Sequence, residues 1–241
     1  MGEVVKAVTL AAGRGTRMKG LTEDRPKPML ELGGRPMLAH QIERMEEAGI
    51  REVLVVVGYK AHLVEEYFRR HPPARATVSY VLQEQQSGTG SAAMLARDFA
   101  AGESFLMTYG DILVEGRIYS ELIAAAAGAE MGLAVRKVAD PFQGGAVYTA
   151  GDRVTKIVEK PERGASTTNW INAGIYVFGP SIFQALDGIE LSPRGEYELT
   201  DAVHAIVDSG RRVGWYAIEG FWRDVGRPED LPHAEEFVDN G

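Results

Sequence analysis

A glycine-rich loop carrying two arginines follows the first apolar run of the sequence. The segment reads Leu10-Ala11-Ala12-Gly13-Arg14-Gly15-Thr16-Arg17-Met18. Small residues let a ligand approach the backbone closely, and successive backbone N–H groups can then hold phosphate oxygens. Arg14 and Arg17 add positive charges that can bind phosphate through paired hydrogen bonds. The loop is a candidate phosphate-binding site, although a short glycine pattern taken alone is equally compatible with a tight turn.

Two common nucleotide-binding loops do not fit this segment. A P-loop requires Gly-Lys followed by Ser or Thr, which is absent here. A dinucleotide-binding loop requires a third glycine, where this chain has Met18, and an acidic residue after the second strand. That strand is expected to end at Val57-Gly58-Tyr59, which contains no acid. A nicotinamide-dependent oxidoreductase is therefore disfavoured.

A lysine flanked by prolines follows shortly after the loop. The segment Arg25-Pro26-Lys27-Pro28-Met29 predicts a stiff, extended stretch that holds Lys27 in place. Most lysines are solvated surface charges, but one fixed this close to a phosphate-type loop is a better candidate for binding a phosphate.

Together, the loop at residues 10–18 and Pro-Lys-Pro at residues 26–28 resemble the signature of the sugar-1-phosphate nucleotidylyltransferases. That family includes glucose-1-phosphate thymidylyltransferases and N-acetylglucosamine-1-phosphate uridyltransferases, and the resemblance extends over residues 4–232. It implies transfer of a nucleotidyl group from a nucleoside triphosphate to a sugar 1-phosphate, with Mg²⁺ as cofactor and pyrophosphate as the second product.

The resemblance also implies which residues bind the nucleotide. Gln83 would pair with the edge of a pyrimidine through its amide, and Gly88 would contact the base through its backbone. This arrangement favours UTP or dTTP. The implied nucleotide-binding residues are Leu10, Ala11, Ala12, Gly13, Arg14, Gly15, Thr16, Arg17, Lys27, Gln83, Gly88, Thr89 and Gly110, with Arg17, Lys27 and Asp111 as the catalytic residues.

Two aspartates are implied as metal ligands. Asp111 follows Tyr109-Gly110 at the expected end of a buried strand, where ligands bind in α/β sheets. Asp224 stands in Trp222-Arg223-Asp224-Val225-Gly226, which resembles the second metal motif of the family. Magnesium favours one or two carboxylates together with water and substrate phosphates, so the pair suits Mg²⁺.

The acceptor side is implied to include Gly145, Glu159, Lys160 and Asn172, which would bind the sugar hydroxyls and its phosphate. One position departs from the family, because Gly144 stands where a tyrosine is common. Loss of that ring would open the sugar side of the pocket and leaves the acceptor undecided. The segment Arg194–Asp201 also resembles the family and is assigned no catalytic role.

Two alternatives stay open. Gly144 makes a cytidylyltransferase acting on a non-sugar phosphate, such as a polyol phosphate, more plausible. A non-catalytic relative that binds a nucleotide sugar as an effector is disfavoured, because Arg17, Lys27, Asp111 and Asp224 are all retained.

Short β-branched runs that alternate with helical patterns must position these residues. The first half predicts a Rossmann-like α/β fold, with a mainly parallel sheet flanked by helices. After about residue 130 short strands dominate, which predicts a small α+β lobe for the acceptor. Strands are expected at 4–10, 52–57, 77–82, 104–109, 131–138, 146–149, 154–158 and 175–178, and helices at 36–48, 61–70, 89–100 and 199–209.

Composition narrows the class of protein. The 241 residues are 45% hydrophobic with a formal net charge of −8, which supports a sizeable core and argues against a nucleic-acid-binding surface. There are no cysteines and no apolar stretch long enough to span a membrane, so a cytoplasmic protein without membrane partners is expected. We expect one nucleotidyltransferase domain over residues 1–241, with a nucleotide-binding half to about residue 130 and a sugar-phosphate-binding half from 131 onward. A homo-oligomer is left open.

Overall fold

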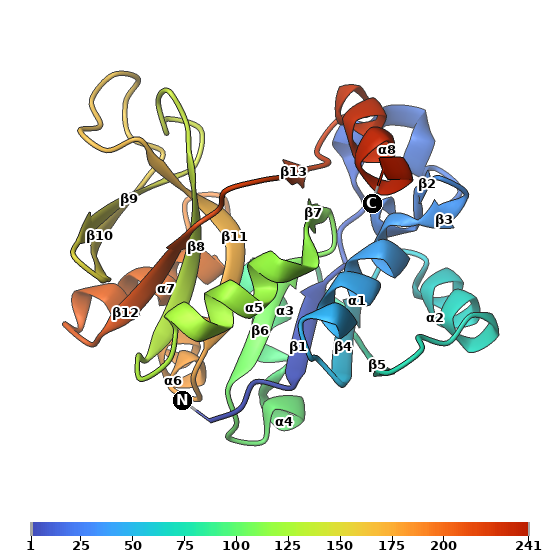
Figure 1. Ribbon diagram of the computed structural model, residues 1–241, viewed down its shortest axis with the longest axis horizontal. Helices are drawn as coiled ribbons and strands as arrows, with labels where there is room; N and C mark the ends of the chain where they lie inside the picture. Colours follow the sequence, from blue (N-terminus) through green and yellow to red (C-terminus); the bar gives the residue numbers. More distant parts are fainter. Residues whose placement is uncertain (1, 241) are drawn as a thin grey trace. The chain divides into compact units, whose positions relative to one another are not determined.

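A computed structural model describes residues 2–240, which form two compact units (Figure 1). We call residues 5–86, 108–119 and 220–240 the glycine-loop unit, and residues 2–4, 87–107 and 120–219 the hairpin unit. Each unit is therefore built from segments that are far apart in the sequence.

The glycine-loop unit is built on parallel strands with nearly continuous apolar runs. Strand β4 (Glu52–Val57) reads EVLVVV and is buried after its first residue, as expected for a strand covered on both faces. It pairs in parallel with β1 (Lys6–Leu10) on one side and with β5 (Thr77–Leu82) on the other. The unit also contains β2 (Glu31–Leu32), β3 (Arg35–Pro36), α1 (Met37–Glu47), α2 (Ala61–Arg70), β7 (Ile112–Val114), β13 (Trp222–Asp224), α8 (Leu231–Asn240) and short 3-10 turns at Thr16–Thr22, Lys27–Met29 and Pro228–Asp230.

Helix α1 is amphipathic and ends where the sequence predicts. Met37, Ile42 and Met45 are buried on one face, and Gly49, with a φ of 96°, follows the helix in the left-handed conformation that favours glycine. Helix α8 packs against β2, as the red and blue ribbons of Figure 1 show. A small core made by Leu32, Met37, Leu113, Val225 and Ala234 joins this helix to the β7–β13 ribbon.

The hairpin unit contains a mixed sheet in the order β11–β8–β12–β10–β9. Strands β8 and β12 are parallel, and the other neighbours are antiparallel. A further pairing of Ile171 with Ala146 joins β11 back to β9. The elements are α3 (Thr89–Met94), α4 (Arg97–Ala100), β8 (Met131–Lys137), β9 (Gly145–Ala150), β10 (Arg153–Glu159), β11 (Trp170–Phe178), α6 (Ile182–Asp187), α7 (Leu199–Asp208) and β12 (Val213–Ala217), while β6 (Phe105–Tyr109) and α5 (Gly116–Ala125) have residues in both units.

The predicted α/β fold with a mainly parallel sheet and a mixed second part is confirmed. The prediction of one helix over residues 89–100 is wrong, because Leu95 and Ala96 donate to carbonyls three residues back and so separate α3 from α4. Strand β11 begins five residues earlier than predicted and contains a bulge near Gly174, whose φ is 73°. Over residues 2–240, no helix is both long and apolar enough to cross a membrane.

Candidate functional site

The two glycines of the loop after β1 have different surroundings. No heavy atom lies within 4 Å of the position that a Cβ of Gly13 would occupy, so this backbone is open to a close approach. Gly15 has a φ of 66°, and its Cβ would lie only 2.8 Å from Cβ of Lys27. The loop therefore packs on Lys27, and both motifs of the sequence signature meet in one place.

The Pro-Lys-Pro segment holds Lys27 differently from the extended stretch that the sequence predicts. Only Pro26 is extended, and Lys27–Met29 form a 3-10 turn in which Leu30 N–H donates to the Lys27 carbonyl at 3.0 Å. The prediction was wrong because the fixed φ of Pro28 suits the first turn of a helix as well as an extended chain. Lys27 is buried, with only 7% of its surface exposed, and Pro28 packs against Gly110.

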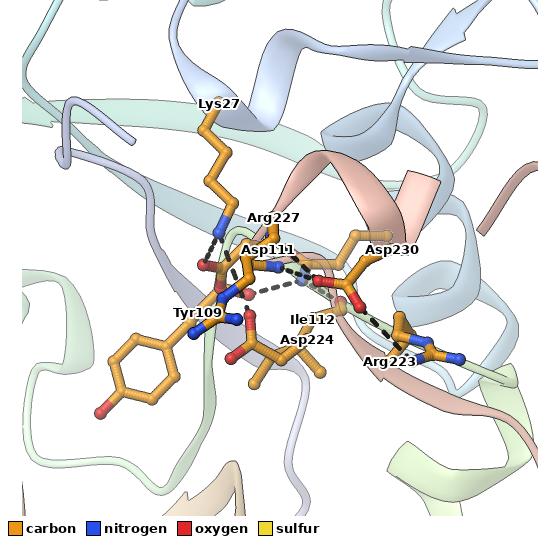
Figure 2. Close-up of polar contacts among 10 residues, drawn as sticks. Lys27, Tyr109, Asp111, Ile112, Arg223, Asp224, Arg227 and Asp230 are labelled. Atoms are coloured by element: carbon orange, nitrogen blue, oxygen red, sulfur yellow. Dashed lines mark hydrogen bonds and ion pairs between the residues drawn. The ribbon is translucent and has the colours of Figure 1, made fainter. Parts of the chain in front are cut away.

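Asp111 and Asp224 lie on one short antiparallel ribbon. Strand β7 pairs with β13 so that Ile112 is opposite Asp224, and Val225 N–H donates to the Asp111 carbonyl at 2.9 Å. Lys27 Nζ lies 2.6 Å from Oδ2 of Asp111 and 3.9 Å from Oδ1 of Asp224. Figure 2 shows the ammonium directed at the Asp111 carboxylate, with Asp224 below it. We call these three residues the carboxylate cluster.

The charges of the carboxylate cluster act on one another. Partial burial and then the Asp111 charge raise the pKa of Asp224 to about 6, while Lys27 and Arg17 act in the opposite direction. Asp224 and Asp111 thus repel each other despite the lysine beside them. The effect of Arg17 on Asp224 also brings the glycine-rich loop into the electrostatic environment of the cluster.

Asp230 orders the turn after Asp224 and was missed by the sequence reading. Its Oδ2 accepts the Gly226 and Arg227 N–H groups at 3.1 and 2.9 Å, and its Oδ1 lies 3.4 Å from the Arg223 guanidinium (Figure 2). The signal was present, since a proline followed by an acidic residue within one turn is typical of a helix start. Asp230 also contributes to the raised pKa of Asp224.

Gln83 follows β5 at the carboxyl end of the parallel strands. The Gln83 side chain is buried, and the backbone N–H of Gln83 donates to the Val57 carbonyl at 2.8 Å. Nearby, Gln86 Nε2 donates to the Ala12 carbonyl at 2.9 Å. The glycine-loop unit thus brings the Gln83 segment to the same end of the sheet as the glycine-rich loop.

Gly88 and Thr89, which are predicted to bind the nucleotide, lie in the hairpin unit and contact the segment 194–201, to which the sequence assigned no role. Tyr197 N–H donates to the Ser87 carbonyl at 2.8 Å, and Gly90 N–H donates to the Tyr197 carbonyl at 2.7 Å. Leu199 N–H donates to Thr89 Oγ1 at 3.0 Å. Segment 194–201 therefore fixes the loop around Gly88 through two backbone hydrogen bonds and one to the Thr89 hydroxyl.

The four predicted acceptor residues come together in the hairpin unit. Gly145 is paired with Glu159 across the β9–β10 hairpin, and a Cβ on Gly145 would lie 3.4 Å from both Glu159 Oε2 and Asn172 Cβ. Lys160 Nζ lies 3.7 Å from Glu159 Oε1. Asn172 Nδ2 donates to the Tyr176 hydroxyl, and its Oδ1 accepts the Gly174 N–H at 2.9 Å. We call these four residues the hairpin cluster.

The space beside Gly144 is not empty. A Cβ at this position would lie 3.0 Å from Cδ1 and 3.2 Å from Cγ1 of Ile171. The isoleucine therefore occupies the space next to the glycine, which differs from the open pocket that the sequence suggested.

Known proteins resemble this chain along nearly its whole length. The chain matches the family described as nucleotidyl transferase over residues 6–241. It is 38% identical over 235 residues to the bifunctional protein GlmU of Methanococcus maripaludis strain C5, covering 97% of this chain and 54% of that one. It is 33% identical over 236 residues to the UTP–glucose-1-phosphate uridylyltransferase AglF of Haloferax volcanii, covering 96% of each.

A solved UDP-glucose pyrophosphorylase in complex with UDP-glucose has the same fold, with a TM-score of 0.89 at 23% identity over 99% of both chains. The chain spans about half the length of the GlmU proteins that it matches. The family match over nearly the whole chain, and the similarity to AglF along the full length of both proteins, lead to one conclusion: the chain belongs to the nucleotidyl transferase family.

Proposed function

We propose that this chain transfers a nucleotidyl group from a nucleoside triphosphate to a sugar 1-phosphate, with release of pyrophosphate. The observation that carries the proposal is the carboxylate cluster, where Lys27 contacts Asp111 and Gly15 packs directly on Lys27. Transfer between phosphates requires groups that position the phosphates and stabilise their charge. The glycine-loop unit offers an open backbone at Gly13, the buried ammonium of Lys27 and two carboxylates for this purpose.

Mg²⁺ fits this cluster. Burial and then the negative charge of Asp111 raise the pKa of Asp224, and a divalent cation bound there would relieve the repulsion between the two carboxylates. No group of three or more Asp, Glu, His or Cys side chains suited to a metal occurs among the described residues. A site with two carboxylates, completed by phosphate and water, agrees with the coordination that Mg²⁺ prefers. When bound there, Mg²⁺ would neutralise charge on the reacting phosphates.

The residues of the chain would bind and orient both substrates. The open backbone at Gly13 and the Arg17 guanidinium would hold the triphosphate, with Lys27 beside the reacting phosphates. An oxygen of the acceptor phosphate forms a bond to the α-phosphorus, and the bond from that phosphorus to the bridging oxygen breaks as pyrophosphate leaves. The attacking oxygen is already ionised at neutral pH, so this step requires no general base.

UTP or dTTP is the favoured nucleotide. Gln83 offers both a donor and an acceptor to a pyrimidine edge, and AglF is a UTP-dependent enzyme by its name. The acceptor is left undecided, because Gly144 stands where the family resemblance implies a tyrosine. A cytidylyltransferase that uses a polyol phosphate is the alternative that this position favours.

A matrix of nucleotides and acceptor phosphates tests the choice of both substrates. ATP, CTP, GTP, UTP and dTTP are each combined with several hexose 1-phosphates and with a polyol phosphate, and pyrophosphate release is measured with Mg²⁺. Release with UTP or dTTP and a sugar 1-phosphate is expected. Release only with CTP and the polyol phosphate would favour the alternative, and no release with any pair would overturn the enzymatic proposal.

A further inference from the structure

Helix α1 carries one buried amide on its otherwise apolar face. Gln41 is 1% exposed and lies among Met37, Ile42 and Met45, which are also buried. A side-chain amide in such a position is costly unless both of its ends are hydrogen-bonded. Its three partners all come from other elements of the glycine-loop unit.

Two of these hydrogen bonds bracket Asp111. Gln41 Nε2 donates to the Tyr109 carbonyl at 2.8 Å and to the Ile112 carbonyl at 2.8 Å. These carbonyls stand on either side of Gly110-Asp111, the turn between β6 and β7. At its other end, Gln41 Oε1 accepts the hydroxyl of Thr9 at 3.1 Å.

The chemistry of the partners requires an amide at this position. Backbone carbonyls only accept hydrogen bonds, so the group that faces both of them must have two N–H donors. The Thr9 hydroxyl then donates to the remaining oxygen and fixes the orientation of the amide. A carboxylate would place its oxygens against both carbonyls, and an aliphatic side chain would offer no donor.

The turn that carries Asp111 is therefore held at four consecutive residues. Gln41 binds the carbonyls of Tyr109 and Ile112, Gly110 N–H donates to the Leu10 carbonyl at 2.9 Å, and the Asp111 carbonyl accepts from Val225. We infer that Gln41 is a positioning residue: it fixes the Asp111 turn, so that the carboxylate is held at Lys27 and toward the cation. The cation part of this inference rests on the proposed function.

The test compares two variants, one at Gln41 and one at its partner Thr9, and each new side chain is nearly isosteric with the one that it replaces. Gln41→Met removes both donors to the Asp111 turn, and Thr9→Val removes only the bond that orients the amide. The primary readout is amide hydrogen exchange of the full chain, followed at Val225 and along β7, with the β4 amides as an internal reference. The second readout is the affinity for Mn²⁺ alone, measured by electron paramagnetic resonance without nucleotide.

We expect Gln41→Met to increase exchange at Val225 and β7 about tenfold more than Thr9→Val does, with equal exchange in β4. We also expect it to weaken Mn²⁺ binding by roughly 10- to 100-fold, the range found when groups that orient metal ligands are lost. Thr9→Val should change the Mn²⁺ affinity by less than about threefold, because both donors to the turn remain.

Equal exchange at Val225 and β7 in the two variants would overturn the inference, whatever the activity of the protein. If Gln41→Met does not fold, Gln41→Asn replaces it. The amide is then kept but withdrawn by one methylene, and the same local increase in exchange is expected. A wild-type chain that binds no Mn²⁺ and releases no pyrophosphate would contradict the proposed function, while hydrogen exchange would still decide the role of Gln41.

Discussion

A Cβ on Gly15 would lie 2.8 Å from Cβ of Lys27, so only glycine lets the glycine-rich loop lie directly on the lysine. The φ of 66° adds a second requirement, because a residue with a side chain is strained in this region by about 1–2 kcal/mol. Gly13, two residues earlier, has neither restriction.

Alanine at these two glycines should therefore give different results. Gly15→Ala should lower the free energy of unfolding by at least about 1–2 kcal/mol and also reduce kcat. Gly13→Ala should change stability by less than about 0.5 kcal/mol but raise the KM for the nucleoside triphosphate. Denaturant unfolding and steady-state kinetics measure both. Gly20→Ala is the control, since its Cβ would meet only Glu23 Oε1 at 3.8 Å. Equal effects of all three variants would contradict this account.

Loss of the Asp111 charge should abolish most of the catalytic rate. Asp111→Asn should lower kcat by roughly 10²–10³, as removal of one preorganised charged contact does in other enzymes, and should raise the Mg²⁺ concentration needed for half-maximal rate. Pyrophosphate release against Mg²⁺ concentration measures both. Asp152→Asn, which removes an exposed carboxylate paired with Arg212, is the matched control and should leave kcat unchanged. A near wild-type rate for Asp111→Asn would exclude the assigned role.

Burial, and then the Asp111 charge, raise the pKa of Asp224, which predicts that its ionised form is less favourable in the metal-free fold than in the unfolded chain. In the unfolded chain an aspartate titrates near 4, whereas in the fold Asp224 titrates at about 6. The folded state then binds more protons between these values, so the contribution of Asp224 to stability is fully present below about pH 4 and is lost as the pH rises through about 6. Asp224→Asn should therefore raise the melting temperature at pH 7.5, with no gain below pH 4.

The measurement is thermal unfolding without divalent cations between pH 3 and pH 8. Asp152 serves as a control of opposite sign, because the hydrogen bond from Arg212 lowers the pKa of that carboxyl. Its contribution has the opposite sign, present at neutral pH and lost on acidification, but the pair is exposed to solvent, so Asp152→Asn should lower the melting temperature at pH 7.5 only slightly and not at low pH. A stability difference for Asp224→Asn that does not vary with pH would contradict the assignment.

Thr89 joins the nucleotide loop to the start of α7. Thr89→Val removes the acceptor of the Leu199 N–H and should cost about 1 kcal/mol, as loss of a helix N-terminal acceptor does. It should also raise the KM for the nucleotide more than the KM for the acceptor. Thr89→Ser retains the oxygen and should restore both values. The KM values are measured with each substrate varied in turn. Equal KM values for the Thr89→Ser and Thr89→Val variants would contradict this role.

Gly144 and Ile171 should be coupled in the choice of acceptor. Gly144→Tyr alone would place a side chain against Ile171 and should destabilise the hairpin unit by about 1–3 kcal/mol. The double variant with Ile171→Ala should recover much of that loss and change the KM for the acceptor phosphate, while the KM for the nucleotide stays the same. Additive effects of the two substitutions in a double-mutant cycle would show that the side chains do not share this space.

The sequence was most informative where local pattern and structure coincide. Strands β4 and β5 and helix α2 have the predicted bounds, because continuous β-branched runs and punctuation by glycine and proline are local signals. The glycine-rich loop, Lys27, Asp111 and Asp224 were also found from local motifs, and the structure brings them together in one unit.

What the sequence did not show depends on long-range pairing. The β7–β13 ribbon has three residues in each strand, too few for a period-two pattern to be read, although it carries one candidate metal ligand and adjoins the other. The sequence carries no local signal for the role of Gln41, since its partners Thr9, Tyr109 and Ile112 are distant in the sequence. The turn at Lys27 was misjudged because proline permits both conformations.

The pairing of β7 with β13 has a consequence for how the protein is made. Asp111 is translated long before Asp224, yet the two carboxylates share one ribbon. A nascent chain therefore cannot complete this cluster until residue 224 has left the ribosome, and every shorter polypeptide lacks the second carboxylate. Synthesis from the N-terminus thus delays assembly of the carboxylate cluster until β13 has been made, and a polypeptide that lacks β13 would also lack the strand that pairs with β7.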